Sequence, residues 1–318
     1  IIIFLVLLIL LPFIANDYML YVLNLIGISI IGAIGMNILT GFTGLISLGH
    51  AAFIGIGAYG TSILSMKLGL PFILALPAGA SISAIFGVII GIPSLRVKGL
   101  YLLVATLAFQ IIFEYLLFHL TFITGGREGI TVKSASLFGM SFSSEKSFFY
   151  LILVLVVLSI IFATNVFRTN VGRAFIAIRD RDIAAELVGI NVFKFKLLAF
   201  GLSSFYAGIA GGLWAYHVNS ISPEHFPLWL SIRYIAMVII GGLGSRIGAI
   251  FGAAFVILIP EVLSAIASLV HLDVGVLSSL QQIVFGMLII LFLIVEPDGL
   301  AELWSRIKKY WKLWPYSY

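Results

Sequence analysis

Two carboxylates lie inside apolar runs that are long enough to cross a membrane. Glu114 is well within its run, and Glu261 directly follows Pro260, where a helical backbone can kink. A charged side chain is costly in hydrocarbon, so such residues usually face water or a protein partner. These two residues could therefore carry an ion or contact a substrate. The alternative is that each lies at the outer interface or pairs with another helix.

Other polar side chains interrupt the same kind of run and could face a common pathway. An intramembrane polar group marks a functional site or a helix contact, and sequence alone leaves both interpretations open. The translocation-path candidates are Asn37, Thr40, Gln110, Glu114 and Glu261.

Several kinds of reactive site have no support in the sequence. The chain has no cysteine, and its five histidines are scattered without the helical spacing of a metal pair. No lysine follows a glycine, so a phosphate-binding P-loop is absent, and no serine lies in a Gly-x-Ser-x-Gly elbow. The pattern Gly55-x-Gly57-x-x-Gly60 lacks the acidic residue that a dinucleotide site requires. We therefore expect no catalytic residue, no metal and no cofactor bound by this chain.

Residues 165–197 form the one long charged stretch in an otherwise apolar chain and hold six of its eighteen basic residues. Asp180 and Asp182 can start a helix there and Gly189 can end it. The predicted helix has one apolar face, and its acidic residues disfavour the alternative that it lies on anionic lipid. We expect this stretch to contact a partner through Arg173, Arg179, Asp180, Arg181, Asp182, Ile183, Ala184, Glu186, Leu187 and Gly189.

The surrounding elements follow from composition. Hydrophobic residues make up 62% of the 318 residues and charged residues 10%, far from the balance of a soluble protein. A helical span needs roughly 20 apolar residues, so the chain is predicted to be an all-α polytopic membrane protein, with residues 1–318 forming a single transmembrane domain. The ten predicted spans are 1–14, 18–39, 51–68, 71–92, 99–120, 148–167, 198–218, 232–243, 247–270 and 280–295.

The basic residues predict the orientation, because Lys and Arg are retained on the cytoplasmic side. The loop 165–197 and the tail 296–318 are both basic, and four spans separate them, so both are expected inside together with both termini. With Arg96, Lys98 and Arg246, this places thirteen of the eighteen basic residues in the cytoplasm. The tail, where Trp304 and other aromatic residues lie among lysines, is predicted to be an interfacial anchor. This distribution indicates topology and contact with the lipid bilayer, and not nucleic-acid binding.

Glycine is too dense between Gly41 and Gly49 for a stable helix, which predicts a turn at the membrane edge or beside a cavity. Gly41, Gly44 and Gly49 are the residues of this glycine turn. A similar pattern recurs at 241–255, which suggests a parallel internal repeat. Glycine and alanine are common in membrane helices, so a chance recurrence is the alternative. The spacing of Ser204, Gly208 and Gly212, and of Gly244, Gly248 and Gly252, favours close helix packing over a nucleotide site.

Three stretches together resemble the M-type membrane permeases of branched-chain amino acid ABC importers. They are 41–59 (GFTGLISLGHAAFIGIGAY), 172–191 (GRAFIAIRDRDIAAELVGIN) and 296–301 (EPDGLA), and the similarity extends from about residue 25 to residue 303. The middle stretch is the most specific. Asp298 departs from the family pattern, which usually has a basic residue between Pro and Gly.

The resemblance implies a subunit of a prokaryotic inner-membrane importer. Its partners would be a second, related permease, two cytoplasmic ATPases that bind ATP and Mg, and an external solute-binding protein. The segment from Arg179 to Gly189, with Arg173 in its lead-in, would be the helix that docks into the ATPase. Branched-chain amino acids are the implied substrate, and urea, short amides or aromatic acids are the alternatives within the family. The residues alone also leave open an ion-coupled secondary transporter that uses Glu114 and Glu261.

Overall fold

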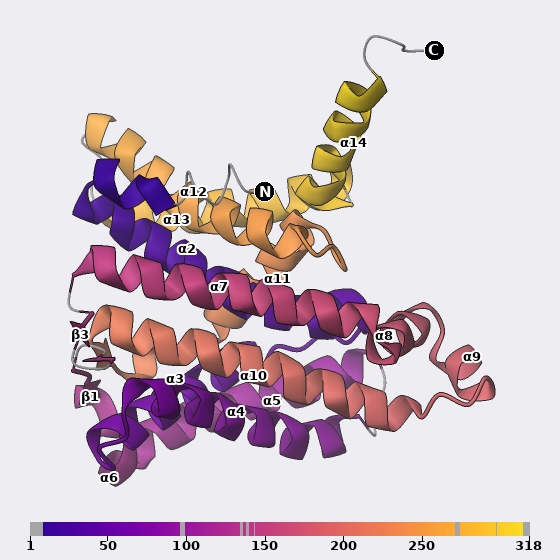
Figure 1. Cartoon of the computed structure of the whole chain (residues 1–318), viewed down its shortest axis with the longest axis horizontal. Coiled ribbons are helices and arrows are strands. Elements are labelled where there is room, and N and C mark those ends of the chain that lie inside the picture. The colour runs from indigo at the N-terminus through magenta and orange to yellow at the C-terminus, as the bar shows by residue number, and fades with distance from the viewer. Residues whose placement is uncertain are drawn as a thin grey trace.

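The structure, a computed structural model, describes residues 9–95, 99–133, 136–137, 140–142, 144–270, 274–296 and 298–313. Long helices run side by side along one common direction and form the body of the molecule (Figure 1). They are α2 (Asp17–Met36), continued by the π-helix η1 (Asn37–Phe42), α3 (His50–Met66), α4 (Phe72–Ser94), α5 (Leu100–His119), α7 (Glu145–Arg168), α10 (Val192–Val218), α11 (Leu228–Gly241), α12 (Gly248–Val270) and α13 (Val274–Val295).

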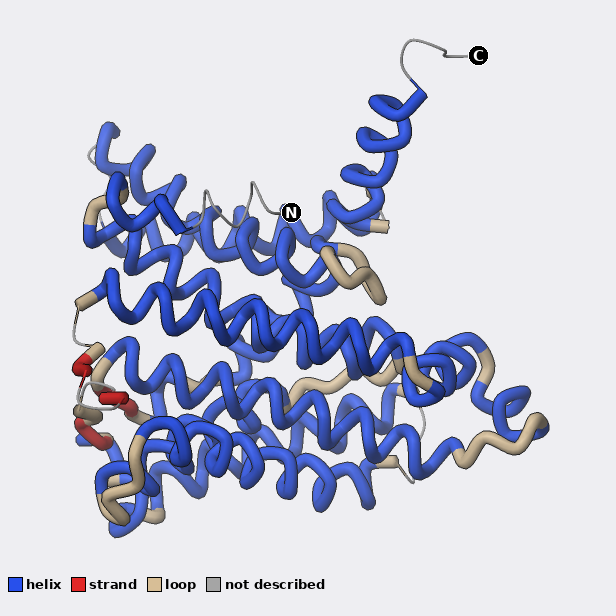
Figure 2. The backbone as a smooth tube through the Cα atoms, viewed as in Figure 1, coloured by secondary structure: helices blue, strands red, loops and turns tan. Residues whose placement is uncertain are grey.

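Short elements gather at the two ends of these helices (Figure 2). One end carries two small antiparallel strand pairs, in which Ile130 faces Ile221 and Ser136 faces Ser141. The elements at that end are α6 (Thr121–Thr124), η2 (Gly126–Glu128), β1 (Ile130–Thr131), β2 (Ser136–Leu137), β3 (Met140–Ser141), β4 (Ser220–Ile221) and η3 (Pro223–His225), and those at the other end are α8 (Asn170–Asp180), α9 (Asp182–Leu187) and α14 (Gly299–Leu313).

Six helical segments in the described chain are long and apolar enough to cross a membrane. The polytopic all-α class is thereby confirmed, whereas the count of ten spans and the cytoplasmic location of the termini stay predictions. Helices α3 and α11, predicted as the spans 51–68 and 232–243, have 17 and 14 residues, short of the roughly 20 that a crossing needs. Of the predicted span 1–14, residues 1–8 lie outside the described part. The six segments are Asp17–Phe42, Phe72–Ser94, Leu100–His119, Glu145–Arg168, Val192–Val218 and Gly248–Ile266.

Glycines bring the central helices α3, α4 and α10 into backbone contact. A side chain at Gly57 would collide with the backbone of Gly208, and one at Gly208 would collide with Ala80 of α4. A side chain at Gly252 would likewise collide with Met237 of α11. Small residues let helices approach closely where lipid provides no hydrophobic drive. The packing interpretation is confirmed for Gly208 and Gly252, and Gly57 takes part in the same packing. Gly244 is the exception, because its φ of 75° places it in the turn before α12, which begins at Gly248.

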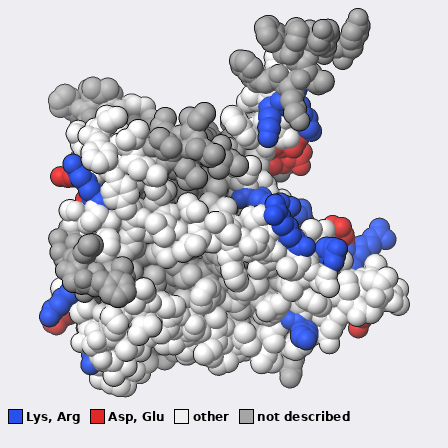
Figure 3. All heavy atoms as spheres, viewed as in Figure 1, with Lys and Arg blue, Asp and Glu red and all other residues white. Residues whose placement is uncertain are grey.

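Charged side chains lie at the two ends of the molecule, and the face between them is largely uncharged (Figure 3). Basic residues gather most densely at the end that carries α8, α9 and α14, which is the end we predict to be cytoplasmic. Arg96 and Lys98, also predicted there, lie outside the described residues. The separation matches a slab of hydrocarbon around the middle of the long helices.

Candidate functional site

The charged loop forms two helices where the sequence predicted one. Helix α8 follows a break at Thr169, whose side chain accepts a hydrogen bond from the Val171 amide. It already contains Arg173, Arg179 and Asp180, and it buries Phe175 completely. At Arg181 the backbone becomes extended, and α9 begins at Asp182. The prediction of one helix from Arg179 to Gly189 is therefore wrong, because the extended residue turns the chain between α8 and α9.

The second helix, α9, exposes its apolar side chains. Ile183 is 66% exposed, Leu187 84% and Val188 77%, and Ala185 is the one residue of α9 that is buried. Gly189 has a φ of 87°, and the Ile190 amide bonds back to the Ala185 carbonyl over 3.0 Å, the arrangement of a glycine-terminated helix. This confirms Gly189 as the end of the helix. Apolar side chains at a tip among charged residues form a surface that suits a protein partner.

The three remaining members of the predicted set, Asp182, Ala184 and Glu186, lie within α9 itself. Asp182 accepts a hydrogen bond from the Ile183 amide at 3.0 Å, and its carboxylate pairs with Lys196 of α10 at 3.4 Å. Ala184 and Glu186 are exposed. The tip is thus tied to the start of α10, and the exposed side chains of α9 can contact a partner.

Arg179 points away from this tip and into the body. Its guanidinium donates a hydrogen bond to the Gly41 carbonyl oxygen at 2.6 Å. The same guanidinium lies against Gly244, where a side chain would collide with it. We had expected Arg179 on the partner-facing surface, and the structure places its side chain instead between the two glycine turns.

Asn37 joins the same two turns from the other side. Its amide nitrogen donates to the Ser245 carbonyl at 2.7 Å, and its amide oxygen accepts from the Gly244 amide at 2.9 Å. Asn37 is 3% exposed. We call Asn37, Gly41, Arg179, Gly244 and Ser245 the turn junction. It connects α8, the π-helical end of α2 and the link between α11 and α12.

The predicted glycine turn begins inside the π-helix η1, which contains Gly41, and continues as non-helical backbone from residue 43 to α3. Thr40 donates to the Leu45 carbonyl at 3.1 Å, and Thr40 is 8% exposed. Gly44 adopts a φ of 73°, and Gly49 immediately precedes α3. The turn from the suspected repeat, 241–244, lies directly against it. The two turns that resemble each other in sequence therefore also contact each other, at the turn junction.

A row of polar side chains on α5 holds the start of α3. The side-chain oxygen of Gln110 accepts from the Ala52 amide at 2.8 Å, and its nitrogen donates to the Phe226 carbonyl and to Glu114, each at 2.9 Å. Ser231 of α11 accepts from the Ala51 amide at 2.8 Å. The first amides of a helix lack partners within it. Gln110, which is fully buried, therefore supports a helix that starts deep inside the molecule.

The two carboxylates that could act in transport lie in separate places. Glu114 is half-buried beside Gln110, whereas Glu261 on α12 accepts a hydrogen bond from the Tyr18 hydroxyl at the start of α2. Glu261 also lines an otherwise apolar groove between α2 and α12. Of the five path candidates, Gln110 and Glu114 are brought together. Asn37 and Thr40 are engaged at the glycine turns.

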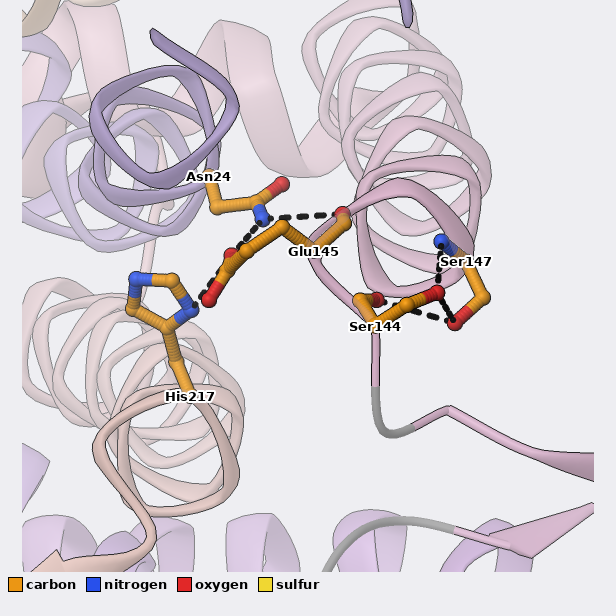
Figure 4. Close-up of polar contacts among 5 residues, drawn as sticks. All are labelled: Asn24, Ser144, Glu145, Ser147 and His217. Atoms are coloured by element: carbon orange, nitrogen blue, oxygen red, sulfur yellow. Dashed lines mark hydrogen bonds and ion pairs between the residues drawn. The ribbon is translucent and has the colours of Figure 1, made fainter. Parts of the chain in front are cut away.

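A polar cluster at the opposite end of the molecule was not predicted (Figure 4). Asn24 donates to the Glu145 carboxylate at 2.8 Å and to its carbonyl at 3.3 Å, and His217 lies 3.8 Å from the same carboxylate. The His217 ring stacks with the rings of Tyr21 and Phe148. The cluster ties the start of α7 to α2 and α10. An asparagine within an apolar run was the available signal, but its partner lies 121 positions away.

The described residues contain no group of three or more histidine or acidic side chains that could hold a metal ion. The exposed tip directly follows α8, and the last arginine of α8 contacts two turns at the ends of α2, α11 and α12. Such an arrangement can pass a displacement of the tip into the helical body.

Comparison with known proteins identifies relatives along most of the chain. Residues 18–293 match the model of a family described as the permease component of branched-chain amino acid transport systems. The high-affinity branched-chain amino acid transport system permease protein LivM of Salmonella typhimurium is 32% identical over 316 residues, which cover 92% of this chain and 72% of the relative. LivM of Escherichia coli strain K12 gives the same figures. The fructose import permease protein FrcC of Rhizobium meliloti is 28% identical over 60% of this chain and 56% of its own length. No solved structure matches the chain.

Proposed function

Because the chain belongs to the family of branched-chain amino acid transport permeases, we propose that it forms part of the membrane pathway of an ATP-driven importer for these amino acids. The observation that carries the mechanism is the connection from the exposed tip of α9 to the turn junction. The similarity to the two LivM proteins extends over 92% of the chain and supports the substrate class. Urea, amides, aromatic acids and ion-coupled transport are not favoured by these comparisons.

The assembly that we propose contains a second permease, two ATPases and an extracytoplasmic solute-binding protein in the inner membrane of a prokaryote. This chain supplies no P-loop, so ATP and Mg would be held by the ATPases and hydrolysed there. The proposed role of this chain is transport and coupling, without a catalytic residue of its own.

The coupling route that we propose starts at Ile183, Leu187 and Val188, which are exposed enough to enter an apolar groove of an ATPase. Movement of α9 would be passed through Arg181 to α8, whose face with Phe175 is buried against the body. Arg179 would then carry the movement to Gly41 and Gly244. Packed cores respond to such shifts by switching between discrete arrangements. The result would be a change in the relative position of α2, α11 and α12.

Glu114 is the path candidate that the geometry favours. It is half-buried in the second half of α5, where Gln110 donates a hydrogen bond to it. A carboxylate there could contact the ammonium group of an amino acid as it passes. Asn37, Thr40 and Gln110 would act indirectly, by holding the turns and the start of α3.

The double substitution of Ile183 and Leu187 by Asp tests the coupling assignment. Both side chains are largely exposed, so the variant should insert normally. It should lose co-purification with the ATPase and lose uptake of labelled leucine by the assembled transporter. The control is Lys194→Gln, which alters another exposed residue of the same loop. Normal association of the double variant would show that α9 is not the docking element.

The substrate class is tested separately, with the wild-type assembly in proteoliposomes. Uptake of labelled leucine, isoleucine or valine should depend on ATP and on the solute-binding protein, and it should persist when proton and sodium gradients are abolished. Uptake of urea in place of these amino acids would contradict the substrate assignment. Uptake by the purified chain alone under an ion gradient would contradict the importer class.

A further inference from the structure

Helix α14 has a two-sided surface that neither the pathway nor the coupling route uses. Its apolar residues recur at the spacing of one helical face, from Leu300 through Leu303 and Trp304 to Ile307 and Tyr310. The arc of the helix opposite these residues carries Glu302, Arg306 and Lys309. We propose that α14 lies on the anionic inner leaflet of the membrane, with its apolar face in the boundary between headgroups and acyl chains.

The direction of α14 fits this location. The helix leaves the body at the end that carries α8 and runs across the common direction of the long helices (Figure 1). A helix in that orientation, at that end, lies in the plane of the bilayer surface when the long helices cross the bilayer. Amphipathic helices with aromatic residues on one face and basic residues on the other bind membranes in this way.

The first part of the apolar face of α14 packs against the helical body, and the later part is exposed. The Trp304 ring contacts the Phe251 ring in the first turns of α12, with 6.1 Å between centroids. Ile307 and Tyr310, further along the same face, are 50% and 66% exposed. The apolar face of α14 therefore contacts α12 at Trp304 and continues away from α12, at the same depth relative to the bilayer. Acyl chains and the headgroup boundary are the surroundings that the exposed part would meet.

Two contacts fix α14 in this position. Gly299, with a φ of 73°, turns the chain sharply after α13 and lies against the backbone of Gly242. Arg306 forms an ion pair with Glu296 at 2.9 Å. These contacts within the chain fix the direction of α14 without any contribution from lipid.

The charge of α14 selects the kind of lipid. Residues 299–313 contain Glu302 and four basic residues, Arg306, Lys308, Lys309 and Lys312. Glu302 lies 3.9 Å from both Arg306 and Lys309 and offsets part of this charge. The remaining positive charge favours phosphate headgroups of an anionic leaflet, and the attraction weakens with salt.

The chain has no cysteine, so a single introduced cysteine can carry a unique spin label. Ile307→Cys and Lys309→Cys place labels on opposite faces of α14, two residues apart. The chain is reconstituted in nanodiscs of phosphatidylcholine with or without phosphatidylglycerol. Collision rates of each label are measured with oxygen, which partitions into lipid, and with a water-soluble nickel chelate.

We expect the label at 307 to favour oxygen and the label at 309 to favour the nickel chelate, with a several-fold difference in the ratio of the two rates. The contrast should shrink without phosphatidylglycerol, at high salt, or when Lys308→Gln is added to Ile307→Cys. Ser305→Gln is the uncharged control. A label at 307 that favours nickel, or that neither reagent reaches, would overturn the lipid contact. A contrast that phosphatidylglycerol does not change would overturn the preference for anionic lipid.

Discussion

At the scale of single residues, the most informative side chain is Arg179. Its type and its place in a charged loop suggested contact with a partner protein, yet its guanidinium bonds to the Gly41 carbonyl within the same chain. Sequence reasoning identified the residue but not its direction, because a partner 138 positions away leaves no local pattern. Asn37 shows the same limit. It was selected as a path candidate, and its amide bonds to the second glycine turn.

Arg179→Gln should separate association from transport. The substitution removes the charge-assisted bond to the Gly41 carbonyl, and such bonds contribute about 1.5–3 kcal/mol. We expect the ATPase to bind as before, whereas ATP-driven uptake falls about tenfold or more. Lys194→Gln, which alters an exposed basic residue of the same loop, is the control. Equal effects of the two substitutions on uptake would argue that Arg179 acts only through the general charge of the loop.

Asn37→Asp should destabilise the end of the body that carries α8. The carboxylate can accept from the Gly244 amide but cannot donate to the Ser245 carbonyl, so a buried acceptor loses its partner and faces a negative charge. The expected loss of stability is about 1–3 kcal/mol or more, seen as a lower melting temperature in detergent. The matched control is Asn191→Asp, since Asn191 caps α10 by accepting from the Lys194 amide at 3.0 Å and aspartate caps equally well. Unchanged melting of Asn37→Asp would show that the junction bonds add little.

At the scale of elements, hydrophobic runs and breaks predicted most helices well, because lipid requires continuous helices with apolar surfaces. The runs 71–92, 99–120 and 148–167 lie within α4, α5 and α7 to within a residue. The predictions failed where a helix starts or breaks because of contacts with distant side chains and not because of a local sequence pattern. Helix α3 starts deep in the body because Gln110 and Ser231 bind its first amides. No proline or glycine lies next to Arg181, so the sequence does not predict the break there.

Helix contacts give a test at this scale. Gly57→Ala should push α3 away from Gly208 of α10, because a Cβ at Gly57 would collide with the Gly208 backbone. Overpacking of this kind costs about 1–3 kcal/mol, measurable as a lower thermal stability of the purified chain. Gly286→Ala is the control. Gly286 lies inside α13 with no atom near its missing Cβ, so alanine there should leave stability unchanged or raise it slightly. Similar melting of both variants would contradict the glycine-mediated contact.

At the scale of the whole molecule, charge and hydropathy indicated a membrane body with two different ends, and the structure has that arrangement (Figure 3). The loop 165–197 and the tail helix α14 lie at the same end, as their basic residues predicted. The sequence could not show that the two glycine turns meet there, since their contact depends on how α2, α11 and α12 pack. The orientation of this body in the membrane rests on the basic residues and is open to direct measurement.

Single cysteines in the cysteine-free chain can measure that orientation. Ile183→Cys on α9 and Lys309→Cys on α14 lie at the end that we predict to be cytoplasmic, and Lys133→Cys lies after β1 at the other end. All three native side chains are exposed. An impermeant thiol reagent should label position 133 in intact spheroplasts, and positions 183 and 309 only after lysis or in inverted vesicles. Because positions 183 and 309 are separated by four predicted spans, opposite labelling of these two would contradict that even number. Labelling of 183 and 309 from outside, with 133 protected, would invert the topology, and with it the location proposed for the ATPase contact.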